Sequence, residues 1–289
     1  MSETPDWFWD AIETKPESGF VEIDECDVHY QYWSEPAGQG LLFVHGHNAH
    51  AHWWDFIAPF FKDDYQSVAL DLTGMGDSDH RDAYSNDTYA KEILGVADEL
   101  ELPVDTVLIA HSFGGMMALH TVALNPGRFK GLILVDSGVR HPEDIEERDA
   151  QVDRWVKPKI YPNREIAQSR FRLQPPQQCD NQYVVDYIAR NSIEYDDGED
   201  GWCWKFDDEL NSRMTMQGDL KEEYKSINIP LALIYGEHSE SFKVKSANYM
   251  KEMKPELTLI EIKDARHHLF LDQPMAFVDA VKGILKDWS

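Results

Sequence analysis

The sequence predicts an α/β fold with a mostly parallel central sheet of about eight strands flanked by helices. Six short, almost purely apolar runs recur along the 289 residues, and unbroken apolar runs are typical of strands that are covered on both faces. Segments with a helical pattern lie between most of these runs, as βα repeats with right-handed crossovers require. Near the amino terminus, two alternating segments flank a polar turn and predict a hairpin, which brings the number of strands to eight.

The elements are expected in the following order. The hairpin joins 19–24 and 28–33 around the polar turn at 24–27. The apolar strands are expected at 41–44, 67–70, 106–110, 132–135, 231–235 and 257–262. The helices are expected at 52–62, 87–101, 114–125, 242–254 and 274–287.

A long interval without an apolar strand separates the sixth strand from the seventh. Residues 139–219 contain acidic clusters, two consecutive prolines and more aromatic residues than a disordered linker would hold. We expect this segment to form a helical cap over one end of the sheet, inserted between two parts of a core domain at 1–138 and 220–289. The alternative is a peripheral subdomain that contacts no substrate.

Composition restricts the partners and the compartment. With 27 Lys and Arg against 53 Asp and Glu, the net charge of −26 would repel nucleic acid and anionic membrane surfaces. Cys26, Cys179 and Cys203 make neither a disulfide framework nor a C-x-x-C metal or redox site. The amino-terminal residues lack a signal-peptide pattern, and no apolar run reaches the ~18 residues needed to span a bilayer. We therefore expect a cytoplasmic protein without membrane insertion.

The acidic residues are unevenly distributed. Residues 1–138 hold 6 basic and 24 acidic side chains, residues 139–219 hold 11 and 18, and residues 220–289 hold 10 and 11. Because the excess lies mostly in the first part of the core, it does not indicate steering of a cationic substrate through the cap. We interpret it as a solvated face adapted to salt or cold.

A serine stands at the turn from the strand at 106–110 into the helix at 114–125. Small residues flank it, Ala110 two positions before Ser112 and Gly114 two positions after it, and they make a tight turn feasible. Such a turn projects the hydroxyl beyond the sheet while the next backbone N–H points toward a developing oxyanion. Taken alone, the segment is also compatible with Ser112 as a helix cap.

Three further motifs accompany this turn. His45-Gly-His-Asn48 follows the strand at 41–44, Asp71-Leu-Thr-Gly-Met-Gly-Asp-Ser78 follows the strand at 67–70, and His267 begins a segment that ends in Asp272-Gln-Pro274. With these four motifs in order, the sequence resembles the α/β-hydrolase fold superfamily over about residues 19–289. The resemblance is to members with a serine nucleophile, a cap domain and esterase or lipase activity.

The resemblance implies a role for each matching residue. Ser112 would be the nucleophile and His267 the base that takes its proton, since an unassisted serine is a weak nucleophile. His267, and not His268, stands seven residues before Pro274, as the family's pattern requires. The backbone N–H groups of His47 and Phe113 would form the oxyanion hole.

The third member of a Ser-His-acid triad is open. Where the family usually has an acidic residue after the strand at 231–235, this chain has Ser239. Some members carry the acid at the end of the preceding strand, where Asp136 stands here, and a charged residue at the end of an apolar strand needs a partner. We favour Asp136, with Glu240 and Glu237 as alternatives.

The expected activity is hydrolysis of a small ester-like substrate, a carboxylic ester, thioester or lactone, by a carboxylesterase-type enzyme. Family members that open epoxides or displace halide carry aspartate at the position of Ser112, which excludes them as models. Carbon–carbon bond hydrolysis and a ligand-binding protein with little turnover are alternatives. No cofactor is expected, because no dinucleotide or phosphate loop is recognisable.

A zinc hydrolase is a further alternative. His45, His47 and His50 form an H-x-H-x-x-H pattern that is similar to the zinc loop of metallo-β-lactamase-fold hydrolases. That loop normally has aspartate directly before the third histidine, and Ala49 stands there in this chain. We therefore expect no bound metal.

Aromatic residues of the expected cap are candidates for the substrate pocket. An apolar group could be surrounded by Trp202, Trp204, Phe206 and Phe171, together with His268, although a Trp-x-Trp pattern in a small subdomain more often forms its own core. Arg170 and Arg172 flank Phe171, where they could hold a carboxylate-bearing substrate or lie on the surface.

Overall fold

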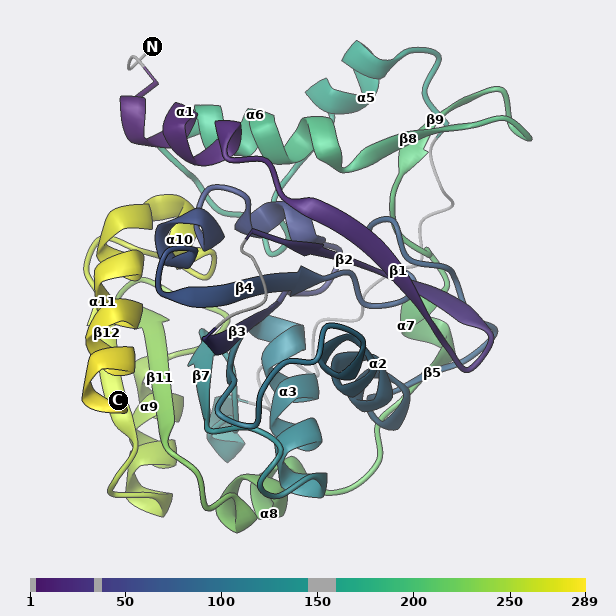
Figure 1. Cartoon of the computed structure of the whole chain (residues 1–289). Coiled ribbons are helices and arrows are strands. Elements are labelled where there is room, and N and C mark those ends of the chain that lie inside the picture. The colour runs from purple at the N-terminus through teal and green to yellow at the C-terminus, as the bar shows by residue number, and fades with distance from the viewer. Residues whose placement is uncertain (1–3, 34–37, 145–159) are drawn as a thin grey trace.

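The computed structural model describes residues 4–33, 38–144 and 160–289, and its centre is a mixed sheet of eight strands. The strands are β1 (Glu17–Ile23), β2 (Cys26–Tyr32), β3 (Gln39–Val44), β4 (Tyr65–Leu70), β6 (Val107–His111), β7 (Gly131–Val135), β11 (Leu231–Gly236) and β12 (Thr258–Ile262). Their order across the sheet is β1-β2-β4-β3-β6-β7-β11-β12 (Figure 1). The pairs β1·β2 and β2·β4 are antiparallel, and the other neighbours are parallel. The predicted fold class is confirmed, including the amino-terminal hairpin.

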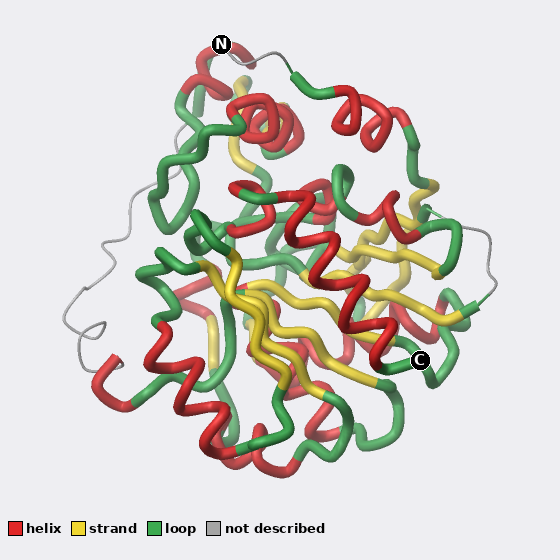
Figure 2. Tube along the Cα trace, turned by 90° about the vertical axis from the view of Figure 1, so that its left-hand side faces the viewer, coloured by secondary structure: helices red, strands yellow, loops and turns green. Residues whose placement is uncertain are grey.

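Helices cover both faces of this sheet (Figure 2). One face packs against α1 (Asp6–Glu13), α10 (Leu269–Asp272) and α11 (Pro274–Asp287), and the other against α2 (Asn86–Glu99), α3 (Ser112–Leu124), α8 (Leu220–Ser226) and α9 (Val244–Met253). In β3, Leu41 and Phe43 face the first layer while Leu42 and Val44 face the second. Burial on both faces explains why the strands are unbroken apolar runs. Among the described residues, no helix combines the length and the apolar character that a membrane crossing requires.

The segment expected as one helix at 52–62 is instead two short 3₁₀ helices, Ala51–Trp54 and Ala58–Phe61. Pro59 lacks a backbone N–H and its ring would clash with the carbonyl of the residue four positions earlier, so an α-helix cannot run through it. The side chain of Asp55, between the two turns, binds His52 Nδ1 at 2.7 Å and accepts a hydrogen bond from the Tyr187 hydroxyl at 2.6 Å. Helices α1 and α8 were not expected from the sequence.

The chain leaves the sheet after β7, the sixth strand of the eight, and returns to it at β11. The described part of this excursion contains α5 (Arg164–Ser169), α6 (Gln182–Asn191) and α7 (Leu210–Arg213), together with an antiparallel hairpin of β8 (Ile193–Asp196) and β9 (Gly201–Trp204). Figure 1 shows α5, α6 and this hairpin together beyond one end of the sheet. Further along, β10 (Met214–Thr215) pairs in parallel with β5 (Tyr84–Ser85) of the core. The sequence did not indicate the hairpin, and the division at 138 and 219 stays a prediction.

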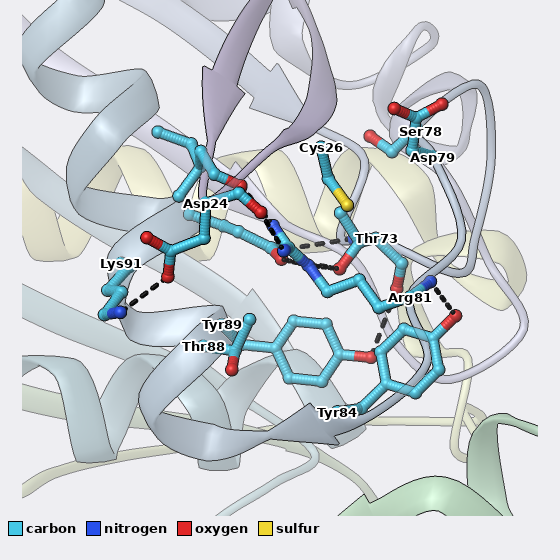
Figure 3. A network of polar contacts seen from close by, with 12 residues as sticks. Asp24, Cys26, Thr73, Ser78, Asp79, Arg81, Tyr84, Thr88, Tyr89 and Lys91 are labelled. Carbon is cyan, nitrogen blue, oxygen red and sulfur yellow. Dashed lines mark hydrogen bonds and ion pairs between the residues drawn. The ribbon is translucent and has the colours of Figure 1, made fainter.

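A buried ion pair holds the loop after β4 against α2 and the amino-terminal hairpin (Figure 3). Arg81 Nε donates to Glu92 Oε1 and to Thr73 Oγ1, both at 3.0 Å, and Glu92 is fully buried. The other guanidinium nitrogens donate to the carbonyls of Ile23 and Asp24, which connect β1 to β2. Burial raises the pKa of Glu92, whereas its hydrogen bonds with Thr73 and the charge of Arg81 lower it. The guanidinium thus joins three parts of the chain around one carboxylate.

Replacement of Arg81 by methionine tests the importance of this pair. Arg81→Met leaves Glu92 without its cation in a buried position, and breaking a buried pair in this way costs about 3–5 kcal/mol. We expect a loss of that size in the free energy of unfolding, measured by urea denaturation. The control is Lys91→Met, which breaks an exposed ion pair with Asp24 and is expected to change stability little. An equally small loss in Arg81→Met would contradict the role assigned to the buried pair.

Candidate functional site

Polar residues that follow separate strands meet at one edge of the sheet. Ser112 follows β6, Asp136 follows β7, His47 lies in the turn after β3, and His267 lies between β12 and α10. Parallel strands place all their carboxyl ends at the same edge, where α/β proteins commonly hold their ligands. The fold therefore brings residues from four distant segments into one place.

The turn at Ser112 is tight and the backbone there is strained. Ser112 has a φ of 51°, in the left-handed region that residues with a Cβ rarely adopt. A Cβ on Gly114 would overlap the carbonyl oxygen of His45, and one on Gly115 would overlap Ser137. The two glycines thus allow α3 to begin close against the turn after β3 and against the end of β7, which aims Ser112 away from the sheet.

A chain of two hydrogen bonds links Ser112, His267 and Asp136. His267 Nε2 lies 2.9 Å from Ser112 Oγ, and His267 Nδ1 lies 2.6 Å from Asp136 Oδ2. Asp136 and His267 are 2% and 5% exposed, whereas Ser112 is only partly buried. A carboxylate at Nδ1 favours the tautomer with the proton on that nitrogen, which leaves Nε2 to accept the serine proton.

Strand β11 and the loop after it supply the other hydrogen bonds of Asp136. Its Oδ1 accepts from the backbone N–H of Gly236 at 3.1 Å, and its Oδ2 accepts from Ser239 Oγ at 2.6 Å. Burial raises the pKa of Asp136, and the hydrogen bonds from Ser239 and Gly236 lower it. The serine that departs from the family's usual acid is therefore a donor to the carboxylate beside His267, a contact that the sequence analysis did not foresee.

The two alternative acids lie elsewhere. Glu237 and Glu240 are both exposed. Glu237 forms an ion pair with Lys263 and accepts a hydrogen bond from the backbone N–H of Asp264. Of the three carboxylates that the sequence left open, the structure brings Asp136 to His267.

Two further histidines surround His267 and are held neutral. The ring centroids of His111 and His268 each lie 4.8 Å from that of His267. Burial lowers the pKa of both neighbours well below the usual range. A positive charge that develops on His267 thus meets two uncharged rings and the carboxylate of Asp136.

The residues expected at the oxyanion hole flank Ser112. The His47 ring packs edge-on against the Phe113 ring, with centroids 5.5 Å apart. A Cβ on Gly46 would lie 3.3 Å from Ser112 Cβ, so the turn after β3 passes directly beside the serine. Both backbone segments that would supply the oxyanion donors therefore lie against the proposed nucleophile.

The histidines of the zinc-like pattern are engaged in separate contacts. His45 binds the carbonyl of Gly46 through Nδ1 and accepts from the backbone N–H of Leu72 through Nε2. His50 Nε2 lies 2.8 Å from Ser192 Oγ. Within the described residues, the ligand-like clusters are His111-His267-His268, His29-Asp71-Asp77 and the exposed Glu237-His238-Asp264, and none of them contains two histidines of the pattern. This geometry gives the zinc alternative no support.

A cavity of about 180 Å³ extends from the turn after β3 toward the inserted segment. Its walls come from the core and from the insertion: His47, Asn48, His50, Trp53, Arg170, Phe171, Arg172, Gln174, Ser192, Trp204, Lys205 and Phe206. Of the expected pocket residues, Phe171, Trp204 and Phe206 are in this wall. Trp202 instead packs on Tyr195 and under the guanidinium of Arg164, and His268 lies behind Trp53, with ring centroids 5.2 Å apart. Lys205 was missed by sequence reasoning, because no local pattern marks it.

Most of the chain matches a family model and proteins with known names. A model described as the alpha/beta hydrolase family matches residues 41–280. An uncharacterized hydrolase of Bacillus subtilis is 24% identical over 283 residues, covering 91% of this chain and 96% of that protein. An esterase of Mycobacterium tuberculosis is 24% identical over 255 residues, covering 85% of this chain and 82% of that protein.

Solved structures have the same fold. The structure of the Mycobacterium tuberculosis esterase superposes with a TM-score of 0.75 at 21% identity, covering 99% of this chain and all of that one (100%). A thioesterase domain from the curacin biosynthetic pathway has a TM-score of 0.76 at 23% identity, covering 92% of this chain and 99% of that one. At these identities the likeness concerns the arrangement of the elements.

Proposed function

The chain belongs to the α/β hydrolase family, and from that premise we propose that it is a serine hydrolase that cleaves a carboxylic ester, thioester or lactone through an acyl-enzyme. The observation that supports this proposal most directly is the hydrogen-bond chain from Ser112 through His267 to Asp136. Three side chains from separate loops take the order that nucleophilic catalysis by serine needs.

The proposed reaction begins with proton transfer from Ser112 Oγ to His267 Nε2 as the oxygen attacks the ester carbonyl. The tetrahedral oxyanion is held by the backbone N–H groups of His47 and Phe113, which act where negative charge develops. His267 then gives its proton to the leaving alcohol or thiol, and Ser112 is left as an acyl ester. Water, deprotonated by His267, attacks this ester and releases the acid and the free serine.

Asp136 is proposed to stabilise the imidazolium form of His267 and to hold its tautomer. Its carboxylate is nearly inaccessible to water, so the charge on it is screened little and acts strongly on the adjacent ring. Ser239, which stands where the family usually has an acid, donates a hydrogen bond to this carboxylate. Carbon–carbon bond hydrolysis of a β-diketone-like substrate would use the same groups and is the alternative to ester cleavage.

The first test is a series of p-nitrophenyl esters of increasing acyl length, with wild type and Ser112→Ala. We expect hydrolysis by the wild type and a loss of about 10⁴-fold or more in kcat for the variant, because the nucleophile is removed. A fluorophosphonate probe should label wild type stoichiometrically and leave Ser112→Ala unlabelled. Activity or labelling that persists in the variant would exclude the proposed mechanism.

The identity of the acid is tested by Asp136→Asn against Glu240→Gln and Glu237→Gln. Loss of the Asp136 charge removes the group that stabilises the imidazolium, so kcat should fall by about 10³–10⁴-fold. The two exposed glutamates are matched controls for the loss of one charge, and their variants should keep wild-type kcat. A large loss in either control, with Asp136→Asn active, would move the acid to the loop after β11.

Ser239 is tested through the pH profile of kcat/KM. Ser239→Ala removes a hydrogen bond that lowers the pKa of Asp136, so the carboxylate binds protons more tightly and holds the imidazolium more strongly. The acidic limb should therefore move to higher pH, by up to about one unit for a hydrogen bond to a charged group. Ser239→Thr keeps the hydroxyl and should restore the wild-type profile. An unchanged limb in Ser239→Ala would show that the hydroxyl does not tune the carboxylate.

A further inference from the structure

The cavity beside the proposed site differs in charge from the rest of the molecule. Among the residues that the structure describes, its wall contains Arg170, Arg172 and Lys205 and no Asp or Glu. The chain as a whole has 53 acidic residues against 27 Lys and Arg. With three cations and no carboxylate among its described residues, this wall is an exception on the protein, and the charge it complements is negative.

The three cations are not equivalent. Lys205 forms an ion pair with Asp77, so its charge is largely compensated. Among the described residues, no carboxylate lies within ion-pair distance of Arg170 or Arg172, and Arg172 Nη1 donates to the backbone carbonyls of Ser169 and Phe171. The two arginines therefore carry the uncompensated positive charge of the wall, on the segment that follows α5.

The remainder of the wall combines aromatic side chains with the polar residues Asn48, Gln174 and Ser192. Phe171 and Trp204 pack against each other, with ring centroids 5.9 Å apart, and Trp53 and Phe206 complete the apolar surface. The wall also includes His47, whose ring contacts Phe113, the residue next to Ser112. A volume of about 180 Å³ suits a short chain or a single ring.

We propose that this cavity receives an arm of the substrate that ends in a carboxylate, held by Arg170 and Arg172, while its carbon atoms lie between the aromatic walls. A guanidinium presents two parallel N–H groups that match the two oxygens of a carboxylate, which a neutral or cationic end group cannot exploit. The inference rests on the proposed serine hydrolase function, because it places the ester carbonyl of the same molecule at Ser112.

The net negative charge of the protein makes cations close to the bound group necessary for binding an anion. A protein with a net charge of −26 repels anions at long range, so affinity for a carboxylate has to come from cations next to the bound group. The same cations disfavour an amine at the end of the arm. The cavity is thus suited to esters of short dicarboxylic acids in preference to neutral esters of equal length.

The test measures binding separately from turnover. Ser112→Ala protein is titrated with monomethyl glutarate and, for comparison, with methyl butyrate, and binding is followed by the fluorescence of tryptophan, since Trp53 and Trp204 line the cavity. We expect the Kd of the carboxylated ester to be at least about tenfold lower than that of the neutral ester. In the triple variant that adds Arg170→Gln and Arg172→Gln, this preference should disappear while methyl butyrate binds as before.

Arg164→Gln is the matched control for loss of a cation. Arg164 begins α5 and its guanidinium lies over the Trp202 ring at 5.6 Å, outside the cavity wall. Added to Ser112→Ala, this change should leave the preference intact. Equal Kd values for the two esters, or a preference that survives the loss of Arg170 and Arg172, would overturn the inference.

Hydrolysis of both esters by the wild type is measured in parallel, so that the two proposals fail in different ways. If the carboxylated ester binds preferentially but neither ester is hydrolysed, the carboxylate site stands and the proposed function is wrong. If both esters are hydrolysed and bind equally well, the proposed function stands and the carboxylate site is wrong.

Discussion

The parallel pairing of β3, β6, β7 and β11 is the constraint on which the candidate site depends. Each of these strands is buried on both faces, so the chain cannot place polar groups along them and must place them where the strands end. Parallel pairing puts all of these ends at one edge. Ser112 and Asp136, which are 24 residues apart in sequence, are there in left-handed backbone conformations with φ values of 51° and 48°. Such strain persists only where the surrounding packing holds it, and here the packed sheet does so.

At this edge of the sheet the carboxylate of Asp136 is buried, and backbone and side-chain donors stabilise its charge. A carboxylate that is 2% exposed is costly unless its oxygens are hydrogen-bonded, and Asp136 accepts from Gly236, Ser239 and His267. Two of these donors, Gly236 and Ser239, belong to β11 and to the loop after it. Strand β11 pairs with β7 on the side opposite to β6, the strand that leads to Ser112. Position 239, occupied by a neutral residue, therefore still takes part in the electrostatics of the site.

The net charge of the whole protein and the charge of the cavity wall have opposite signs. The net charge of −26 comes mostly from the first 138 residues. The described part of the cavity wall carries cations and no carboxylate, and these cations belong to the residues that follow α5 and β9. Because exposed charges are screened over about 8–10 Å at physiological salt, the local cations and not the overall charge govern a group bound in the cavity.

The sequence by itself determined the sheet and most of the helices that flank it. Strands buried on both faces are unbroken apolar runs, which can be recognised in the sequence without knowing which strands pair with them. It also placed Ser112 and His267 in motifs whose residues are close together in the chain. It did not determine the turns at 51–61, where a proline and the side-chain contacts of Asp55 outweigh the helical pattern, or the β8–β9 hairpin in the insertion. Only the tertiary structure placed Asp136, and neither Glu237 nor Glu240, beside His267, and only it brought Arg170 and Arg172 to the cavity. Asp136 and His267 contact each other although they are 131 residues apart in the sequence. Contacts between residues so far apart depend on how strands and loops pack, and no local sequence pattern records that packing.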